Sequence, residues 1–334
     1  SCADFPPNRK SDGRYFDNVI LHNDTLVQTR GFCTDVFFRA ALGWIRDQHQ
    51  AGTPYFPYLS LNAPHGPMIA PESYTRRFAE LGYEGKIVGR YGMIENIDDN
   101  FGVLMKKLDE WGAWENTLVI FMTDNGQARA GGRLHGEPVS SYSAGFKSGK
   151  NTPYEGGTHV PAFWRWKGVL DEGADISALT AHIDLYRTFC ELAGAPIPPG
   201  IQPVDGRSLL PLLQNPAADW PDRDLFVHIG RWEKGQDPDD SKYAGCAVRT
   251  ARWRFVNNRF LYDISADPYE TTDVAAQHPE VVQRLRRRFD AWWSETRPLM
   301  VNEDQPYAPA QPQAVRYETQ LEEKGIPEWV PPPW

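Results

Sequence analysis

The strongest constraint on the fold is a long amphipathic helix between two strand-like apolar segments. Residues 54–62 (PYFPYLSLN) and 117–122 (TLVIFM) have the apolar and aromatic composition of buried strands. Between them, from about Ile87 to Trp111, apolar residues recur every three or four positions, and Gly112 supplies a stop signal. A strand, a crossover helix and a second strand form the repeating unit of parallel sheets. The sequence therefore predicts an α/β fold with a mostly parallel sheet flanked by helices.

The rest of the chain predicts a second, smaller region. The first thirty residues have the polar, irregular pattern of a loop, and residues 34–48, 178–194 and 205–214 that of helices. After about residue 220, short strands alternate with turns, and one helix follows at 279–295. This order is typical of a small α+β subdomain with an antiparallel sheet. The predicted domains are 1–215 for the α/β part, 216–300 for the subdomain and 301–334 for a proline-rich extended tail.

Charge and cysteine content exclude several classes of protein. The net charge is −9, which disfavours nonspecific binding of nucleic acid. The sequence has no apolar run near the roughly 20 residues that a membrane helix needs. The four cysteines form no CxxC pair, which argues against a zinc ribbon, and a single bridge between Cys2 and Cys33 remains open.

The strand-like segment 117–122 ends in Thr-Asp-Asn-Gly, which has two interpretations. Asn-Gly is a strong hairpin signal. However, the thirty residues that follow are rich in Gly, Ser and Pro and contain no alternating apolar run that would pair back. Open α/β sheets bind ligands beyond the carboxyl ends of their strands. Asp124 and Asn125 are therefore predicted to be metal ligands, and their oxygen atoms suit Ca²⁺ or Mg²⁺ rather than zinc.

Two further residues are candidates for chemistry. His65 lies in a Pro-His-Gly-Pro turn directly after a predicted strand, and the alternative is a packing or capping role. Lys150 lies in SGKNTPYEGG, where small residues allow a ligand to approach and an ammonium group can meet an anion. The alternative for Lys150 is an ordinary surface lysine.

Several motifs in this order resemble the type I, formylglycine-dependent sulfatase family, which has the alkaline-phosphatase-like fold. The motifs are LSLNAPHGP, YGMIENIDDNFGVLMKKLDEWG, TLVIFMTDNG, GKNTPYEGGTHVP and DGRSLLPLL. The similarity runs from about residue 14 to about residue 300. Each motif alone is weak, and their order makes the resemblance specific.

The resemblance implies a role for each candidate residue. Asp124 and Asn125 match the family's TDNG ligands of Ca²⁺, with Mg²⁺ less favoured, and His65 and Lys150 match residues that contact the sulfate. A cation and an ammonium group would stabilise the charge on the transferring sulfuryl oxygens. A protonated His65 would assist the leaving oxygen. The implied substrates are aryl or carbohydrate sulfates, and the implied location is periplasmic or secreted.

The printed sequence departs from the family in one important respect. It contains neither the Cys-x-Pro-Ser-Arg nor the Ser-x-Pro-x-Arg motif, whose first residue becomes formylglycine, and it lacks the family's Asp-Asp metal pair. We expect formylglycine only in an amino-terminal segment that precedes these residues, so the chain by itself is expected to be inactive. The missing half, or an oligomer partner, is expected to cover the exposed sheet edge.

Two alternatives to a sulfatase remain open from the sequence. The first is a phosphate or phosphonate ester hydrolase of the same superfamily, with an unmodified Ser or Thr nucleophile. The second is a non-catalytic protein that keeps only the metal and anion pocket.

Overall fold

The computed structural model describes residues 5–9, 14–201, 204–233, 235–300 and 309–333 of the chain. The chain forms two compact units. The first unit comprises residues 1–114, 128–142 and 303–334, and the second comprises residues 115–127 and 143–302. His65 therefore belongs to the first unit, whereas Asp124, Asn125 and Lys150 belong to the second.

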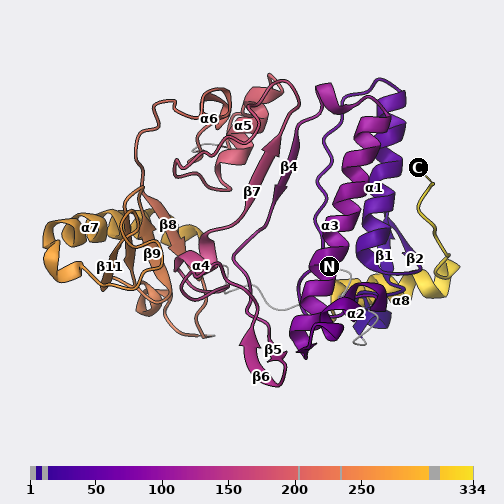
Figure 1. Ribbon diagram of the computed structural model, residues 1–334, viewed down its shortest axis with the longest axis horizontal. Helices are drawn as coiled ribbons and strands as arrows, with labels where there is room; N and C mark the ends of the chain where they lie inside the picture. The colour runs from indigo at the N-terminus through magenta and orange to yellow at the C-terminus, as the bar shows by residue number, and fades with distance from the viewer. Residues whose placement is uncertain (1–4, 10–13, 202–203, 234, 301–308, 334) are drawn as a thin grey trace. The chain divides into compact units, whose positions relative to one another are not determined.

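The first unit is built around helices α1 (Cys33–Gln50) and α3 (Lys86–Glu110), which lie side by side (Figure 1). Both helices were predicted, because their apolar residues recur at helical spacing. The amides of Asn96 and Asn100 on α3 each donate a 2.8 Å hydrogen bond to Oδ1 of Asp35 on α1. The helix predicted from Thr34 begins one residue earlier, at Cys33, and its cap position is Phe32.

Helix α2 (Glu72–Glu80) packs against α3 through glycines. A Cβ atom on Gly89 would lie 1.8 Å from the carbonyl oxygen of Met68, and one on Gly92 would lie 2.9 Å from Cγ2 of Thr75. The absence of side chains at these two positions of α3 therefore lets the chain at 68–75 come into direct contact with the helix.

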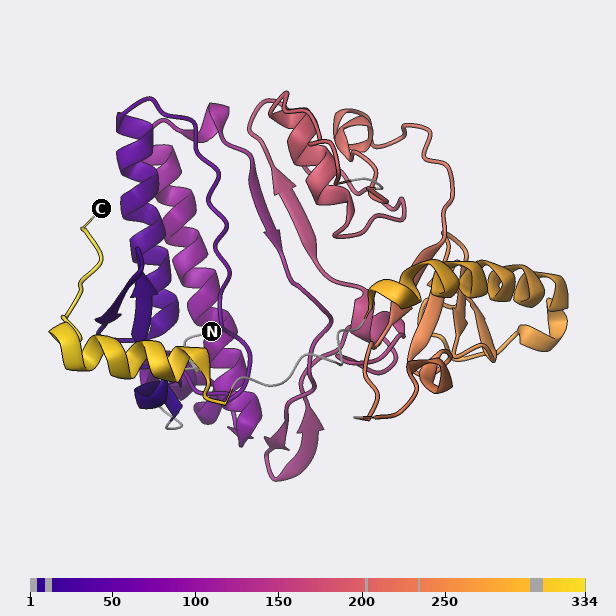
Figure 2. The ribbon, with the colours of Figure 1, turned by 180° about the vertical axis from the view of Figure 1, so that it is seen from behind.

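Two small sheets complete the first unit. Strands β1 (Val19–His22) and β2 (Thr25–Gln28) form a hairpin, and β5 (Gly131–Leu134) lies between β3 (Tyr83–Glu84) and β6 (Glu137–Ser140). Helix α8 (Pro312–Lys324) packs beside the hairpin, as Figure 2 shows. The side chain of Gln320 on α8 bonds both the N–H and the carbonyl of Leu26, at 2.7 and 2.8 Å.

The second unit begins with β4 (Val119–Met122), which pairs antiparallel with β7 (Ala162–Arg165). The short helix α4 (Glu155–Thr158) lies between these strands in the sequence, and α5 (Asp184–Leu192) and α6 (Leu210–Gln214) follow them.

A four-stranded antiparallel sheet in the order β11-β10-β9-β8 completes the second unit. Its strands are β8 (Leu225–His228), β9 (Cys246–Arg249), β10 (Trp253–Val256) and β11 (Phe260–Asp263). Helix α7 (Pro279–Thr296) covers one face, where Leu285, Phe289 and Trp293 are buried with Phe255. On another side, Tyr154 packs against Val256 and Tyr262. The predicted antiparallel subdomain is thus confirmed.

Four expectations about secondary structure were wrong. Residues 54–62 form no strand, and Phe56 and Tyr58 are 68% and 85% exposed. The named strands of the described residues pair antiparallel, so β4 has no parallel neighbour among them. The first thirty residues contain the β1–β2 hairpin. The tail, expected to be extended, contains α8.

The loop expected after Asn125 also contains structure. Strands β5 and β6 form a hairpin whose turn residues, His135 and Gly136, have φ angles of 50° and 85°. The Asn23-Asp24 turn between β1 and β2 uses the same backbone region, with φ angles of 45° and 65°. In both cases the turn residues tolerate a left-handed backbone, and this determines the hairpin where the strand pattern is weak.

Within the part of the chain that the structure describes, no helix combines the length and apolar character needed to cross a membrane.

Candidate functional site

The TDNG turn directly follows β4 and does not form a hairpin. Its strand pairs with β7, which begins forty residues later at Ala162, so the turn interpretation of Asn125-Gly126 is excluded. Asp124 is exposed. The amide nitrogen of Asn125 donates to the carbonyl of Gly126 at 2.9 Å, and the amide oxygen is the atom that a cation would need. Nε2 of His182, just before α5, donates to the carbonyl of Thr123 at 2.8 Å and so fixes the beginning of the turn.

The loop that carries Lys150 folds back onto this turn through backbone hydrogen bonds. The N–H of Gly126 donates to the carbonyl of Gly157 at 3.0 Å, and the N–H of Lys150 donates to the carbonyl of Gln127 at 2.8 Å. A Cβ atom on Gly126 would lie 2.0 Å from the carbonyl oxygen of Gly156, so only glycine permits this contact. The structure thus brings the TDNG turn and the loop of residues 147–157, which we call the lysine loop, into one cluster.

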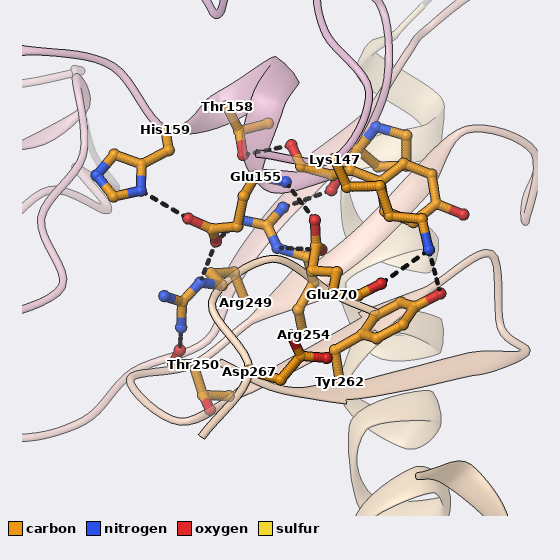
Figure 3. A network of polar contacts seen from close by, with 12 residues as sticks. Lys147, Glu155, Thr158, His159, Arg249, Thr250, Arg254, Tyr262, Asp267 and Glu270 are labelled. Carbon is orange, nitrogen blue, oxygen red and sulfur yellow. Dashed lines mark hydrogen bonds and ion pairs between the residues drawn. The ribbon is translucent and has the colours of Figure 1, made fainter. Parts of the chain in front are cut away.

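A buried carboxylate, that of Glu155, anchors the lysine loop to the four-stranded sheet (Figure 3). Glu155 is 3% exposed, and its Oε1 is paired with Arg254 of β10 and, at 3.0 Å, with Nε of Arg249 of β9. Its Oε2 accepts a 2.7 Å hydrogen bond from Nδ1 of His159, whose ring stacks on Phe146. Burial acts to raise the pKa of Glu155, but the hydrogen bond from His159 and the charges of the two arginines outweigh it and hold that pKa far below its usual range.

Glu270 forms a second, fully buried part of the same network. Its Oε2 accepts from the N–H of Glu155 at 2.9 Å, and its Oε1 lies 3.3 Å from Nε of Arg254. Burial raises the pKa of Glu270, and repulsion from Glu155 adds to this effect. The carbonyl of Glu270 accepts from Nζ of Lys147 at 2.9 Å, and this ammonium also contacts the hydroxyl of Tyr262 at 3.0 Å.

His65 lies in the first unit, in a turn that a buried tyrosine holds in place. The hydroxyl of Tyr15, which is 2% exposed, donates to the carbonyl of His65 at 2.6 Å and contacts the carbonyl of Asn62 at 3.0 Å. The ring of Tyr15 stacks on Phe32, 5.7 Å between centroids. The imidazole is exposed, and its Nδ1 lies 2.9 Å from the carbonyl of Gly66. His65 belongs to the first unit and Asp124 to the second, so the prediction that they share a pocket stays a prediction.

Asp124 and Asn125 have the right ligand atoms for a divalent cation, but the described residues supply too few of them. Asp124 and Asn125 offer a carboxylate and an amide oxygen, the donors that Ca²⁺ and Mg²⁺ prefer. Calcium takes six to eight oxygen ligands, and no group of three or more His, Cys, Asp or Glu suited to a metal occurs among the residues that the structure describes. Asp124 and Asn125 therefore represent part of a ligand set.

Sequence reasoning missed the residues that support the lysine loop. Arg249, Arg254 and Glu270 lie about one hundred residues from the loop in the sequence, and each occurs in an ordinary strand or turn pattern. The sequence offered one local signal. Arg249 and Arg254 each lie in an apolar strand segment, and charged side chains are seldom buried unless they are paired.

Comparison with known proteins identifies the family. The profile of the sulfatase family matches residues 5–195, and that of the N-sulphoglucosamine sulphohydrolase C-terminal region matches residues 148–294. N-acetylgalactosamine-6-sulfatase of Rattus norvegicus is 36% identical over 221 residues, which are 65% of this chain and 38% of that protein. N-acetylgalactosamine-6-O-sulfatase of Bacteroides thetaiotaomicron is 30% identical over 258 residues, 71% of this chain and 47% of that protein.

Solved structures agree with the sequence comparison. The crystal structure of Ps i-CgsB in complex with k-i-k-neocarrahexaose superposes with a TM-score of 0.69 at 26% identity, covering 91% of this chain and 62% of that one. The putative sulfatase yidJ of Bacteroides fragilis superposes with a TM-score of 0.61 at 19% identity, covering 84% of this chain and 62% of that one. The neighbours share the alkaline-phosphatase-like fold, which confirms the predicted fold family, although the named strands of the described residues lack the predicted parallel pairing. The chain spans less than half the length of the two N-acetylgalactosamine-6-sulfatases. It belongs to the sulfatase family.

Proposed function

We propose that this chain supplies part of the active site of an enzyme that hydrolyses sulfate esters of carbohydrates or aryl alcohols. The observation that carries the proposal is the cluster in which the lysine loop closes onto the TDNG turn. It brings a carboxylate, an amide and an ammonium-bearing segment to the end of β4. The names of the relatives, among them N-acetylgalactosamine-6-sulfatases, favour a sulfated carbohydrate as substrate.

Lys150 is the residue proposed to bind the sulfate. Its backbone is fixed at Gln127, two residues beyond Asn125, and its side chain is half-buried. A compact ammonium at this position would neutralise charge that develops on the non-bridging sulfuryl oxygens. His65, held by Tyr15, is proposed to donate a proton to the leaving oxygen.

Asp124 and Asn125 are proposed to hold Ca²⁺ together with ligands from outside the described residues. When bound, the ion would withdraw charge from the sulfate oxygens. A formylglycine hydrate, for which the printed sequence has no motif, would supply the attacking oxygen. We therefore propose that the chain by itself is inactive. We also propose, from the family resemblance, that the natural polypeptide acts outside the cytoplasm.

The exposed strand-like segment 54–62 supports the proposal of a covering partner. Phe56 and Tyr58 are aromatic side chains with 68% and 85% exposure. Burying such side chains is favourable by about 1.5–3 kcal/mol each. Further chain of the natural polypeptide, or a second copy, is proposed to cover them.

The test compares Lys150→Ala with the unchanged natural polypeptide on nitrophenyl sulfate and nitrophenyl phosphate. Losing one charged donor aimed at the transferring group should lower kcat by about 10²–10³-fold. Lys150→Arg should rescue poorly, since a planar fork does not replace a compact ammonium. Lys167→Ala, an exposed lysine of the second unit, is the matched control.

Three results would contradict the proposal. If kcat/KM of Lys150→Ala stayed within about threefold of the parent, a loss below roughly 1 kcal/mol, the lysine would be an ordinary loop residue. A preference for the phosphate ester would favour the phosphoesterase alternative. Absence of turnover on either ester, with calcium present, would favour a non-catalytic protein.

A further inference from the structure

One buried arginine joins three separate segments of the second unit. Arg254 is 3% exposed, and its two terminal nitrogens bond the carbonyl of Pro153 and the carboxylate of Glu155, both in the lysine loop. Its Nε lies 3.3 Å from Oε1 of Glu270, in the turn beyond β11. Figure 3 shows the guanidinium of Arg254 beneath the loop, facing both carboxylates. A planar guanidinium with five N–H groups has the geometry for such a junction.

The lysine loop depends on anchors of this kind, because it has little regular structure of its own. Its only helix, α4, has four residues. Lys147 fixes the beginning of the loop through Tyr262 and the carbonyl of Glu270, and Arg254 fixes the loop again at Pro153. Lys150 lies midway between these two anchors. The backbone that carries Lys150 is therefore held on both sides by the four-stranded sheet and the turn that follows it.

The same anchor reaches the TDNG turn. Gly157 lies two residues after Glu155, and its carbonyl accepts the hydrogen bond from the N–H of Gly126. A buried ion pair gives little net stability over an apolar pair of similar volume, but it demands one geometry, because each charge must keep its partner. The network beneath the loop is thus suited to fixing a position.

We propose that Arg254 is a positioning residue for sulfate ester hydrolysis, acting through Glu155 and Pro153 on Lys150 and on the TDNG turn. This inference rests on the proposed function of Lys150. It gives the C-terminal sheet a part in the chemistry, although that sheet holds none of the residues proposed to contact substrate or ion.

The experiment combines hydrogen exchange with kinetics on three variants. Arg254→Met removes the fork, Arg254→Lys keeps the charge so that a folded variant remains available, and Arg252→Met is the matched control. Arg252 lies two residues away, stacks on Trp253 and pairs with Asp263 at 2.7 Å, outside the network. Amide exchange is measured in the 334-residue chain for peptides covering 119–127 and 147–158. Turnover of nitrophenyl sulfate is measured in the natural polypeptide.

Both Arg254 variants should speed exchange in the two peptides while peptides of the first unit stay unchanged. Arg254→Met should lower kcat by about 10²-fold, the cost of a misplaced group, with KM within about threefold. The kcat of Arg254→Lys should lie between those of Arg254→Met and the parent. The kcat of Arg252→Met should equal that of the parent.

Unchanged exchange in both Arg254 variants, or a kcat equal to that of Arg252→Met, would overturn the inference. So would a loss confined to the amount of folded protein, with kcat per folded molecule unchanged. If the natural polypeptide without substitutions does not hydrolyse sulfate esters, the proposed function fails. The exchange measurement alone then decides whether Arg254 positions the lysine loop.

Discussion

Two loops were predicted to build one site, and the chain supports them very differently. The lysine loop is held through its own Glu155 by Arg254 of β10, both 3% exposed, and is bonded by its backbone to the TDNG turn. The turn of His65 is held by the hydroxyl of Tyr15, and the segment before it is exposed and forms no strand. Within the described residues, buried charges support the lysine loop, whereas the neutral hydroxyl of Tyr15 and local backbone hydrogen bonds support the turn of His65.

The difference shows what a segment needs in order to become an element. Residues 54–62 have a strand's composition, yet no strand pairs with them in the part of the chain described. Residues 119–122 have a similar composition and form β4, because β7 supplies a partner. Composition selects a strand only when a neighbouring backbone satisfies its N–H and carbonyl groups.

The largest effect is expected from breaking the network beneath the lysine loop. Arg254→Met leaves the buried Glu270 and Glu155 short of a partner, which should lower the free energy of unfolding by about 3–5 kcal/mol. Arg252→Met removes a guanidinium that is 57% exposed from its pair with Asp263 and should cost less, about 1 kcal/mol. Urea denaturation followed by tryptophan fluorescence measures the free energy of unfolding of both variants. Equal losses would show that the buried network contributes no more than the Arg252 pair.

The pH dependence of the stability of Glu155→Gln tests whether the charge of Glu155 stabilises the second unit. The folded-state pKa of Glu155 is depressed, so its contribution to stability is present above its unfolded pKa of about 4.5 and is lost as pH falls towards the folded value. The stability difference between the parent and Glu155→Gln should stay constant from about pH 7 to pH 5 and shrink below about pH 4.5. Thermal melting across this range tests the sign. A difference that grows towards low pH would contradict it.

A pair of glycines gives the next largest contrast. Gly126→Ala pushes a methyl group into the carbonyl of Gly156 and should destabilise the second unit by about 1–3 kcal/mol. Gly102→Ala, on α3 with no atom within 4 Å of the added carbon, should instead stabilise the first unit by about 0.5–1 kcal/mol. Melting curves that moved the same way for both would refute the close contact at Gly126.

The smallest effect is expected at the other loop. Tyr15→Phe removes the hydroxyl that holds the His65 turn and should cost about 0.5–1.5 kcal/mol for the lost hydrogen bonding. Amide exchange of residues 62–67 should rise while the lysine loop stays protected. A cost as large as that of Arg254→Met would mean that the two loops are equally braced.

The predictable parts of this chain are those set by short-range patterns. Helices α1, α3 and α7 follow apolar spacing, and backbone hydrogen bonds join the two segments that contain Asp124, Asn125 and Lys150. The β1–β2 and β5–β6 hairpins were missed because their turns depend on left-handed residues rather than on alternation. The pairing of Glu155 with Arg249 and Arg254 depends on contacts across more than ninety residues, which no local pattern encodes.

Lys147 lies in the same loop as Lys150 but has a structural role of its own. Although it lies three residues from Lys150, its ammonium bonds Tyr262 and Glu270 and lies 5.0 Å from the ring centroid of Tyr154. Partial burial acts to lower the pKa of Lys147, but the hydrogen bond that its ammonium donates to Tyr262 outweighs this effect and raises that pKa. Its replacement by alanine would loosen the loop, so Lys147 is not a neutral comparison for Lys150.

The most direct test of the central claim is a crystal structure of the natural polypeptide grown with calcium and sulfate. The account predicts a calcium ion bound by Oδ atoms of Asp124 and Asn125, with a sulfate between this ion and the ammonium of Lys150. It also predicts that the lysine loop keeps its bond from Gly126 to Gly157. A calcium ion bound elsewhere, or a Lys150 side chain directed to solvent beside a bound sulfate, would contradict the account.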